Sequence, residues 1–543
     1  MLSWIQPGVR RLLGVALGLG FWVAPALAQD SAPALPEGPW LDLRTAEHMF
    51  NRFGFGARPA ELHAVVGKRS TELFDLWLAA SESPEQPTPK HYGYDDYGYD
   101  ANSREIPGAP INLLPHAEQV ARRAAMRLAD RRQFRVYVDS VFDDMVAGRQ
   151  PLRDRLALFW HGFFPTSSKV ALRRYELILQ YHFLPCKGLA GFDDLLRGMV
   201  KDPAMLGYFD NDTNSKSHPN ENFARELMEL YSLGVGNYTE VDVREAARTL
   251  TGYQGESGFF VFDEELHDFG EKTILGQTGE YDAEQLVEIL LQQEACANYV
   301  SQRLLSWMEG IEPSAQRVER YGSLLRELDY EITPWLRHLA ADPEFFRAEA
   351  MGTRVQGPID FLVGASHRLK IEDRSTFLFF AAALCGQQFY GPPTVKGWDE
   401  GSAWISASTL TTRGNCVGLL LGHLQEHLRD HRDPEEARAP DEKRIDEMCS
   451  TLRARTFRQP DLARSARGAL GKQASDEELT EWVAETCLAR APQDSTLEHI
   501  RTELLWCRSH FDVQGPLLLS EHGNRILCHL AYTLLRLPIA QLG

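Results

Sequence analysis

The sequence lacks the short motifs of three common enzyme classes. It has no Gly-x-Ser-x-Gly elbow for a nucleophilic serine, no Walker-type phosphate loop and no Gly-x-Gly-x-x-Gly turn after a strand. These absences argue against a serine hydrolase, a nucleotide phosphotransferase and a dinucleotide-dependent oxidoreductase. If the chain is an enzyme, its chemistry is expected to depend on carboxylates, imidazoles or a metal ion instead.

Positive charge is also scarce. The chain has 57 Lys and Arg against 76 Asp and Glu, which gives a formal net charge of −19. Its basic pairs, such as Arg122-Arg123 and Arg131-Arg132, are interleaved with Ala and Leu, as expected for the solvated face of a helix. Nucleic acid and anionic membranes require clustered cations that replace counterions. We therefore expect neither as a partner.

The eight cysteines include no Cys-x-x-Cys pair, which argues against a zinc ribbon or a thioredoxin-like site. An even count in an oxidising compartment permits disulfides, which we expect among the five cysteines from Cys416 onward. Cys186, Cys296 and Cys385 are isolated in the sequence and are expected to be buried thiols.

No apolar run after residue 28 is long enough to span a bilayer. Residues 1–28 have Arg10-Arg11, an apolar core from Leu12 to Val23 and the small-residue pattern Ala26-Leu27-Ala28. This order is typical of a signal peptide. We predict export to the periplasm or the extracellular space, by the general or the twin-arginine route. Removal of the predicted signal peptide takes the formal net charge of the chain from −19 to about −21.

The remaining chain is predicted to be mainly α-helical, with one small β-hairpin near a cluster of motifs. Residues 29–43 form a Pro-rich lead-in, 44–429 the main helical domain, 430–444 a charged linker and 445–543 a helical C-terminal region. Apolar positions at three- and four-residue spacing predict helices over 117–147, 152–164, 285–307 and 332–339.

One segment concentrates polar groups on a single helix face. The spacing from Pro219 to Gly234 predicts a capped helix of about four turns. Its apolar side is formed by Phe223, Ala224, Leu227, Met228, Leu230 and Tyr231, and its polar side by Glu221, Asn222, Arg225, Glu226 and Glu229. The polar side is interpreted either as an ordinary ladder of ion pairs or as one wall of a functional site.

Residues that follow this helix are predicted to fold back onto it. Thr239 and Asp242 have the spacing of a capping box that begins a second helix. Residues 258–262 are expected to form a strand, and His267-Asp268 a turn that leads into a strand at 273–275.

Several ordered motifs resemble the bacterial exported family catalogued as domain of unknown function 1800. They cover roughly residues 44–415, with an echo at 537–542. The blocks are His48 with Asn51–Gly56, Phe159–Phe164, Asp202–Leu206, Pro219–Gly234, Tyr238–Gly252, His267–Gly276, and Gly391–Trp398 with Trp404-Ile405. The resemblance implies no particular activity. It does imply a possible partner, because members are often encoded beside a secreted sulfatase-like protein.

A metal site is one interpretation of these motifs. His161, Glu226, Glu229, His267 and Asp268 would supply two imidazoles and carboxylates, a set that suits zinc, manganese or iron. This interpretation predicts that each imidazole lies within hydrogen-bond reach of a carboxylate from residues 221–229. The competing interpretation is that His161, between aromatic residues, is a structural core residue.

A metal-free interpretation uses carboxylates as acid and base. The candidate catalytic residues are Glu221, Arg225, Glu226, Glu229, Arg248 and His161, with the two arginines orienting charge. The predicted function is that of an exported hydrolase or lyase acting on a polymer of the cell envelope or the extracellular space. The alternative is a non-catalytic partner or assembly module for a secreted sulfatase-like protein.

Residues 391–405 are a rigid turn rich in Pro, Gly and Trp. Tryptophans in such a turn either pack in the core or stack on a sugar ring. The predicted ligand contacts are Asn222, Lys396, Trp398 and Trp404.

Overall fold

The computed structural model describes residues 36–81, 114–167, 174–256, 258–422 and 459–543. Over these residues the protein is mainly α-helical, as predicted, with 21 α-helices and two small antiparallel sheets. The predicted signal peptide, the charged linker at 430–444 and the start of the C-terminal region up to residue 458 lie outside the described residues. Among the helices that are described, none combines the length and apolarity needed to cross a membrane.

The described elements follow one another along the chain in the order of their labels. The first ten helices are α1 (Leu43–Phe53), α2 (Pro59–Val65), α3 (Ser70–Ala80), α4 (His116–Ala147), α5 (Pro151–Phe163), α6 (Arg174–Lys187), α7 (Phe192–Met199), α8 (Pro203–Tyr208), α9 (Asn222–Glu229) and α10 (Glu240–Thr249). After the two sheets come α11 (Ala283–Leu291), α12 (Glu294–Glu309), α13 (Ala315–Glu327), α14 (Ile332–Ala341), α15 (Pro358–Arg368), α16 (Ser375–Leu384) and α17 (Ala407–Leu420). The C-terminal helices are α20 (Leu462–Leu470), α21 (Asp476–Cys487), α22 (Asp494–His510) and α23 (Gly523–Leu535).

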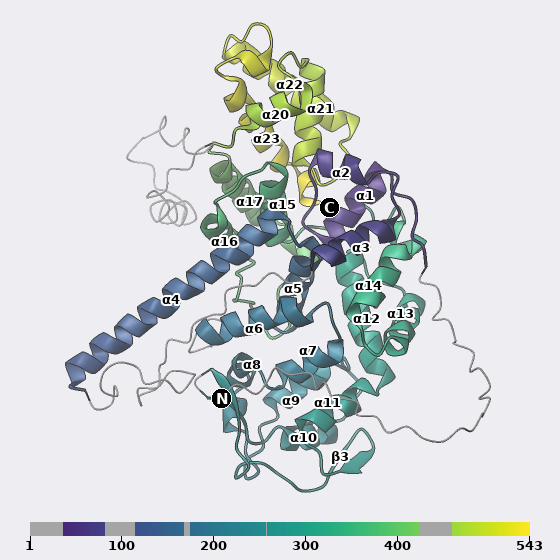
Figure 1. Cartoon of the computed structure of the whole chain (residues 1–543), viewed down its shortest axis with the longest axis vertical. Coiled ribbons are helices and arrows are strands. Elements are labelled where there is room, and N and C mark those ends of the chain that lie inside the picture. Colours follow the sequence, from purple (N-terminus) through teal and green to yellow (C-terminus); the bar gives the residue numbers. More distant parts are fainter. Residues whose placement is uncertain (1–35, 82–113, 168–173, 257, 423–458) are drawn as a thin grey trace, which may run out of the picture.

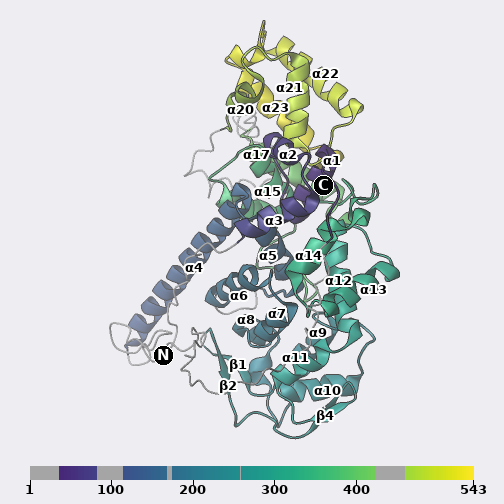
Figure 2. The same cartoon turned by 45° about the vertical axis from the view of Figure 1, so that its right-hand side comes forward.

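The helices are arranged as an elongated body with one long projecting helix (Figures 1 and 2). Helices α20–α23 form one end, and α7–α11 with the two sheets form the other. The N-terminal helices and α15–α17 lie between these ends, while α4 extends outward from the middle. Buried apolar side chains from Leu41 to Ala540 form one continuous core, which α20–α23 share with the rest of the chain.

Three of the predicted helices are found nearly as expected, as α4, α5 and α14. The predicted helix over 285–307 is instead two helices, α11 and α12. Helix α11 ends at Leu291, and Gln293 has an extended backbone before α12 begins. Apolar periodicity continues through this break because both helices contribute to the same core, so the pattern alone did not reveal it.

The helix predicted over 219–234 is only two turns long. Helix α9 begins at Asn222, because Asn220 is held in a loop by hydrogen bonds: its N–H donates to Asn214 Oδ1 (2.9 Å) and its side chain donates to the Asp210 carbonyl (3.0 Å). The predicted apolar side is buried, and the capping box of Thr239 and Asp242 begins α10 as expected.

Two hairpins replace the single hairpin of the prediction. Strand β1 (Tyr253–Glu256) pairs with β2 (Phe259–Phe262), and β3 (Lys272–Ile274) pairs with β4 (Gln277–Gly279). The predicted strands at 258–262 and 273–275 are thus present, but each pairs with a neighbour in sequence rather than with the other.

The structure records all seven cysteines of the described ranges as thiols. The disulfides predicted from Cys416 onward are therefore not formed among Cys416, Cys487, Cys507 and Cys528; Cys449 lies outside the described residues. Cys296 and Cys385 are buried, as predicted, whereas Cys186 is exposed.

Candidate functional site

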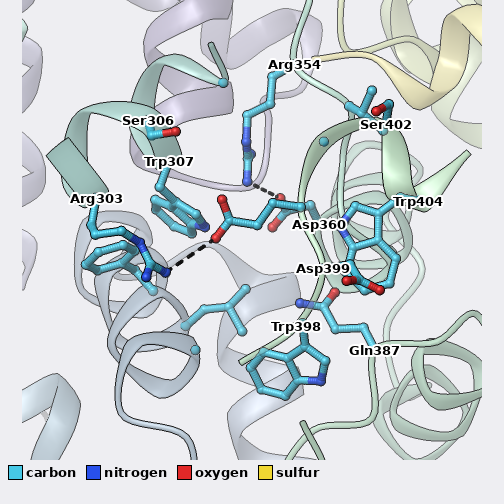
Figure 3. Close-up of a pocket in the computed structure, with 18 of the residues that line it drawn as sticks. Arg303, Ser306, Trp307, Arg354, Asp360, Gln387, Trp398, Asp399, Ser402 and Trp404 are labelled. Atoms are coloured by element: carbon cyan, nitrogen blue, oxygen red, sulfur yellow. Dashed lines mark ion pairs between the residues drawn. The ribbon is translucent and has the colours of Figure 1, made fainter. Parts of the chain in front are cut away.

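A cavity of about 300 Å³ lies where four segments of the chain meet (Figure 3). Its walls come from the end of α5, from α12, from residues 354–360 at the start of α15, and from the loop between α16 and α17. The lining includes three tryptophans, Trp307, Trp398 and Trp404. We therefore call this space the tryptophan cavity. Two of the blocks that carry the sequence resemblance, 159–164 and 391–405, meet at this cavity.

Helices α5 and α12 supply one wall of the tryptophan cavity. Phe159 and Phe163 face it from the last turns of α5, while Arg303 and Trp307 are spaced i, i+4 on α12 and so lie on the same face. Figure 3 shows the Arg303 guanidinium directed toward the centre of the cavity. Its only ion pair among the described residues is a loose contact of 3.9 Å with Glu400.

The opposite wall is the loop that contains Lys396, Trp398 and Trp404. Gly397 is required for its close approach to α5, because its φ is +90° and a Cβ there would lie 2.4 Å from the Gly162 carbonyl oxygen. The Trp398 ring packs beside Gly162. The structure thus places the predicted ligand contacts Lys396, Trp398 and Trp404 on the cavity lining.

A buried ion cluster closes the inner end of the cavity. Asp360, in the first turn of α15, forms ion pairs with Arg155 and, at 2.9 Å, with Arg354. Burial alone would raise the pKa of Asp360, but the two guanidinium groups outweigh it and hold this pKa below its ordinary value. Arg155 also lies 4.0 Å above the ring of Trp307.

Glu226 on α9 is half-buried and is not among the residues that line this cavity. Burial and the neighbouring charge of Glu229 raise its pKa, while Arg225 and Lys396 act in the opposite direction. Lys396, whose charge opposes the rise in this pKa, belongs to the cavity lining. Glu229 in turn accepts a hydrogen bond of 2.9 Å from the Tyr238 hydroxyl. Two of the predicted carboxylates therefore lie together in a partly dehydrated setting.

The other polar residues of this helix form the ladder of ion pairs that was the alternative interpretation. Arg225 contacts Glu221 at 3.1 Å and binds both oxygens of Glu240 on α10 at 2.8 Å. Asn222 is exposed and donates to the Phe209 carbonyl at 3.2 Å. Glu221, Arg225 and Asn222 thus support the fold locally rather than face the cavity.

The turn at His267-Asp268 is also structural. Asp268 binds Arg248 through both oxygens, at 2.7 and 3.3 Å, and this contact lowers the pKa of Asp268. His267 is buried, and its Nδ1 lies 2.7 Å from the carbonyl oxygen of Thr251. The predicted hydrogen bond from His267 to a carboxylate of residues 221–229 is therefore not formed. Arg248, predicted to orient charge in the site, holds this turn instead.

His161 lies in the aromatic core, as the competing interpretation expected, and not beside the carboxylates of α9. Its ring contacts Tyr181, Phe389, Tyr390 and Trp398, and its Nε2 accepts a hydrogen bond of 3.2 Å from the Tyr390 backbone N–H. Burial lowers its pKa to about 3. Within the described ranges, no carboxylate forms a hydrogen bond with His161.

The predicted metal set of His161, Glu226, Glu229, His267 and Asp268 is therefore not brought together. Across the described part of the chain, no group of three or more His, Cys, Asp or Glu side chains is placed to hold a metal ion. The aromatic surroundings of His161 and the local turn around His267, both noted in the sequence as competing interpretations, explain the separation.

The buried state of His161 predicts a pH dependence of stability. Its folded-state pKa lies below the ordinary value of about 6.5, so the unfolded chain binds one more proton between about pH 6.5 and about pH 3. As the pH is lowered through this window, His161 alone should reduce the free energy of unfolding of the wild type by about 1.4 kcal/mol per pH unit. A His161→Gln variant should be less stable but show a shallower loss, as measured by urea denaturation at several pH values. Equal slopes in both proteins would contradict this assignment.

Several cavity residues were missed at the sequence level. Arg303 and Trp307 fall at the end of a predicted helix, where their i, i+4 spacing was the available signal. Arg354 and Asp360 flank Gly357-Pro358, a helix start with an acidic residue in its first turn. Their partner Arg155 is about 200 residues away in sequence, so no local pattern indicated the cluster.

The comparisons with known proteins give a family but no activity. No curated protein and no solved structure matches the chain. Residues 48–506, which include every wall of the tryptophan cavity and helix α9, match the family described as "Protein of unknown function (DUF1800)". This match covers most of the sequence, and the chain therefore belongs to the DUF1800 family.

Proposed function

We propose that the protein is an exported hydrolase or lyase that cleaves a polysaccharide of the cell envelope or extracellular space. The tryptophan cavity would bind the polymer, and Glu226 with Glu229 would carry the acid–base chemistry. The observation on which this rests is the half-buried Glu226, whose pKa is raised by burial and by Glu229 and is opposed by the charge of Lys396, a residue of the cavity lining.

The cavity has the composition expected for sugar binding. Indole rings offer flat apolar faces that stack on sugar rings, and polar side chains at their edges fix the hydroxyl groups. Gln387, Asp399 and Ser402 supply such groups next to Trp398 and Trp404 (Figure 3). The mixed apolar and polar lining favours a saccharide over a purely apolar ligand.

The carboxylate pair fits cleavage of a glycosidic bond. A raised pKa keeps Glu226 protonated to higher pH, so that it can donate a proton to the departing oxygen. Glu229, oriented by Tyr238, would accept the second proton. That proton comes from water in hydrolysis, or from a sugar carbon in β-elimination. Burial together with the charge of Glu226 raises the pKa of Tyr208 and Tyr231, two phenols beside the same carboxylate.

The test is a panel of envelope and extracellular polysaccharides treated with the purified protein. Release of new reducing ends, with or without the ultraviolet absorbance of an unsaturated product, would identify hydrolysis or elimination. We expect at least one polymer to be cleaved by the wild type and not by Glu226→Gln. Cleavage that is equal in the two proteins, or absent with every polymer, would refute the proposal.

The second candidate function is that of a partner or assembly module for a secreted sulfatase-like protein. It is favoured by Leu505 and Trp506, consecutive residues of α22 that are 56% and 55% exposed. We expect Trp506→Glu to abolish co-purification with a sulfatase-like protein encoded beside this one, and Glu226→Gln to leave it intact. Retained co-purification of Trp506→Glu would remove α22 as the contact surface.

A further inference from the structure

We infer that the tryptophan cavity selects an acidic saccharide, one that carries carboxylate or sulfate groups, and binds its anionic group at the inner end through Arg303 and Arg354. This inference rests on the proposed function, in that it names the substrate class of the same site. It follows from the balance of buried charge behind the cavity rather than from the carboxylate pair on α9.

Buried positive charge at the inner end exceeds buried negative charge. Arg155 and Arg354 act electrostatically on Asp360, and the charge of Asp360 in turn acts on Arg52 and Arg413; all four arginine side chains are buried or nearly so. Asp360 makes ion pairs with only two of them, Arg155 and Arg354. Repulsion between neighbouring guanidinium groups contributes to lowering the pKa of Arg52 and Arg155. One carboxylate therefore faces several cations in a medium of low polarity.

The other nearby buried carboxylate does not correct this imbalance. Glu309 acts on Arg52, but its own oxygens are bound by Arg317 at 2.8 Å and by Arg347 at 2.6 Å. It is thus engaged in a separate cluster at the end of α12. Asp360 is therefore the carboxylate that Arg155 and Arg354 share beside the tryptophan cavity.

Some of these cations also have unsatisfied hydrogen-bond donors. Nη2 of Arg155 and both Nε and Nη1 of Arg52 are buried without a hydrogen-bond partner. Arg155 is 1% exposed and stacks on Trp307, which is itself a wall of the cavity. Buried donors of this kind are costly in free energy unless a partner satisfies them or the local field is neutralised.

Arg303 and Arg354 are the two arginines of the cavity lining, which also includes Lys396 on the opposite loop. Figure 3 shows the two guanidinium groups directed toward the same space between Trp307 and Asp360. A guanidinium group matches the planar geometry of a carboxylate or sulfate. The contact of Arg303 with Glu400 is long, at 3.9 Å, so an incoming anion can replace that carboxylate.

Apart from Asp360, the acidic residues of the cavity lining are exposed and do not cancel the positive charge of the buried arginines. Asp399 and Glu400 are exposed, and Glu312 is exposed and accepts a hydrogen bond of 2.7 Å from Gln302. Exposed charges are screened by solvent and salt more strongly than the buried arginines are. An anion at the inner end would therefore experience mainly the positive field.

The test is calorimetric titration of the full-length mature protein with three tetrasaccharides. One consists of galacturonate, one derives from chondroitin sulfate, and one is neutral cellotetraose. We expect the acidic oligomers to bind at least about tenfold more tightly than cellotetraose, with an affinity that falls as salt is added. The chondroitin sulfate oligomer carries sulfate in addition to uronate carboxylates, so its tighter binding would indicate sulfate recognition, whereas tighter binding of the galacturonate oligomer would indicate carboxylate recognition.

Variants locate the binding. Arg303→Gln should weaken binding of the acidic oligomers about tenfold and leave cellotetraose unchanged, whereas Arg303→Lys should lose less. Glu400→Gln should tighten acidic binding, because it removes the carboxylate that contacts Arg303. The matched control is Arg501→Gln on α22, which removes an exposed arginine paired with Glu477 at 3.3 Å and should change nothing.

The outcomes separate this inference from the proposed function. Acidic binding that requires Arg303, without cleavage, would support the inference and refute the enzyme. Cleavage of a neutral polymer, equal binding of all three oligomers, no binding of any, or an Arg303→Gln variant with unchanged preference would overturn the inference.

Discussion

Replacing Asp360 by asparagine is expected to lower the free energy of unfolding by about 3–5 kcal/mol. The side chain is 8% exposed and lies between Arg155 and Arg354. Asparagine keeps the shape of the carboxylate but removes its charge, so the surrounding guanidinium groups would stay buried without compensation. Loss of one member of a buried ion cluster is among the most destabilising of single substitutions.

The measurement is urea denaturation at neutral pH, with Asp399→Asn as the matched control. Asp399 lines the same cavity but is exposed, so its substitution should change stability by less than about 0.5 kcal/mol. An Asp360→Asn protein that unfolds at the wild-type urea concentration would show that the cluster is compensated by other groups.

The same variant tests the protonation state of Asp360. Its folded-state pKa is lowered, so its contribution to stability is present above the unfolded-state pKa of about 3.9 and is lost as the pH falls through the folded value. The difference in stability between wild type and Asp360→Asn should therefore be largest at neutral pH and shrink in strong acid. A difference that grows toward low pH would contradict the assignment.

Much of the fold followed from the sequence because its signals are local. The capping box at Thr239, the apolar side of α9 and the long periodic segment of α4 depend on residues a few positions apart. The break between α11 and α12 was missed because both helices bury apolar faces in one core. The short α9 was missed because Asn214 and Asn220 hold its predicted first turn in a loop.

The site was predicted less completely because it depends on contacts between distant segments. Residues 391–405 were noted for their tryptophans, and the structure places these on the cavity lining. The partners of these tryptophans, Arg303, Trp307 and Asp360, come from other helices. The sequence does not distinguish a structural histidine from a catalytic or metal-binding one. His161 packs between aromatic rings, and His267 lies beside the carbonyl of Thr251.

The strongest effect on function is expected for Glu226→Gln. If Glu226 donates the proton in cleavage, its replacement should lower turnover about 10²–10⁴-fold, while binding of the polymer changes little. Glu221→Gln is the matched control on the same helix. It removes a carboxylate that pairs with Arg225 at 3.1 Å and should leave turnover unchanged. Equal losses in the two variants would indicate damage to α9 rather than to a proton donor.

The stability of Glu226→Gln distinguishes a functional carboxylate from a structural one. Burial and Glu229 raise the folded-state pKa of Glu226, so the folded protein holds this proton to higher pH than the unfolded chain does. Its favourable contribution is present at low pH and is lost as the pH rises above the unfolded-state pKa of about 4.3. Glutamine is neutral at every pH and avoids that loss, so Glu226→Gln should melt at or above the wild-type temperature at neutral pH.

The gain should disappear below about pH 4, where the wild-type carboxyl group is also neutral. A protein that becomes more stable while losing turnover is the pattern of a carboxylate kept in an unfavourable setting for its chemistry. Melting curves of wild type, Glu226→Gln and Glu221→Gln at several pH values, read beside their cleavage rates, provide this comparison. If Glu226→Gln instead melts well below wild type at neutral pH, its carboxylate stabilises the fold through contacts of its charged form, and the role of proton donor passes to another residue.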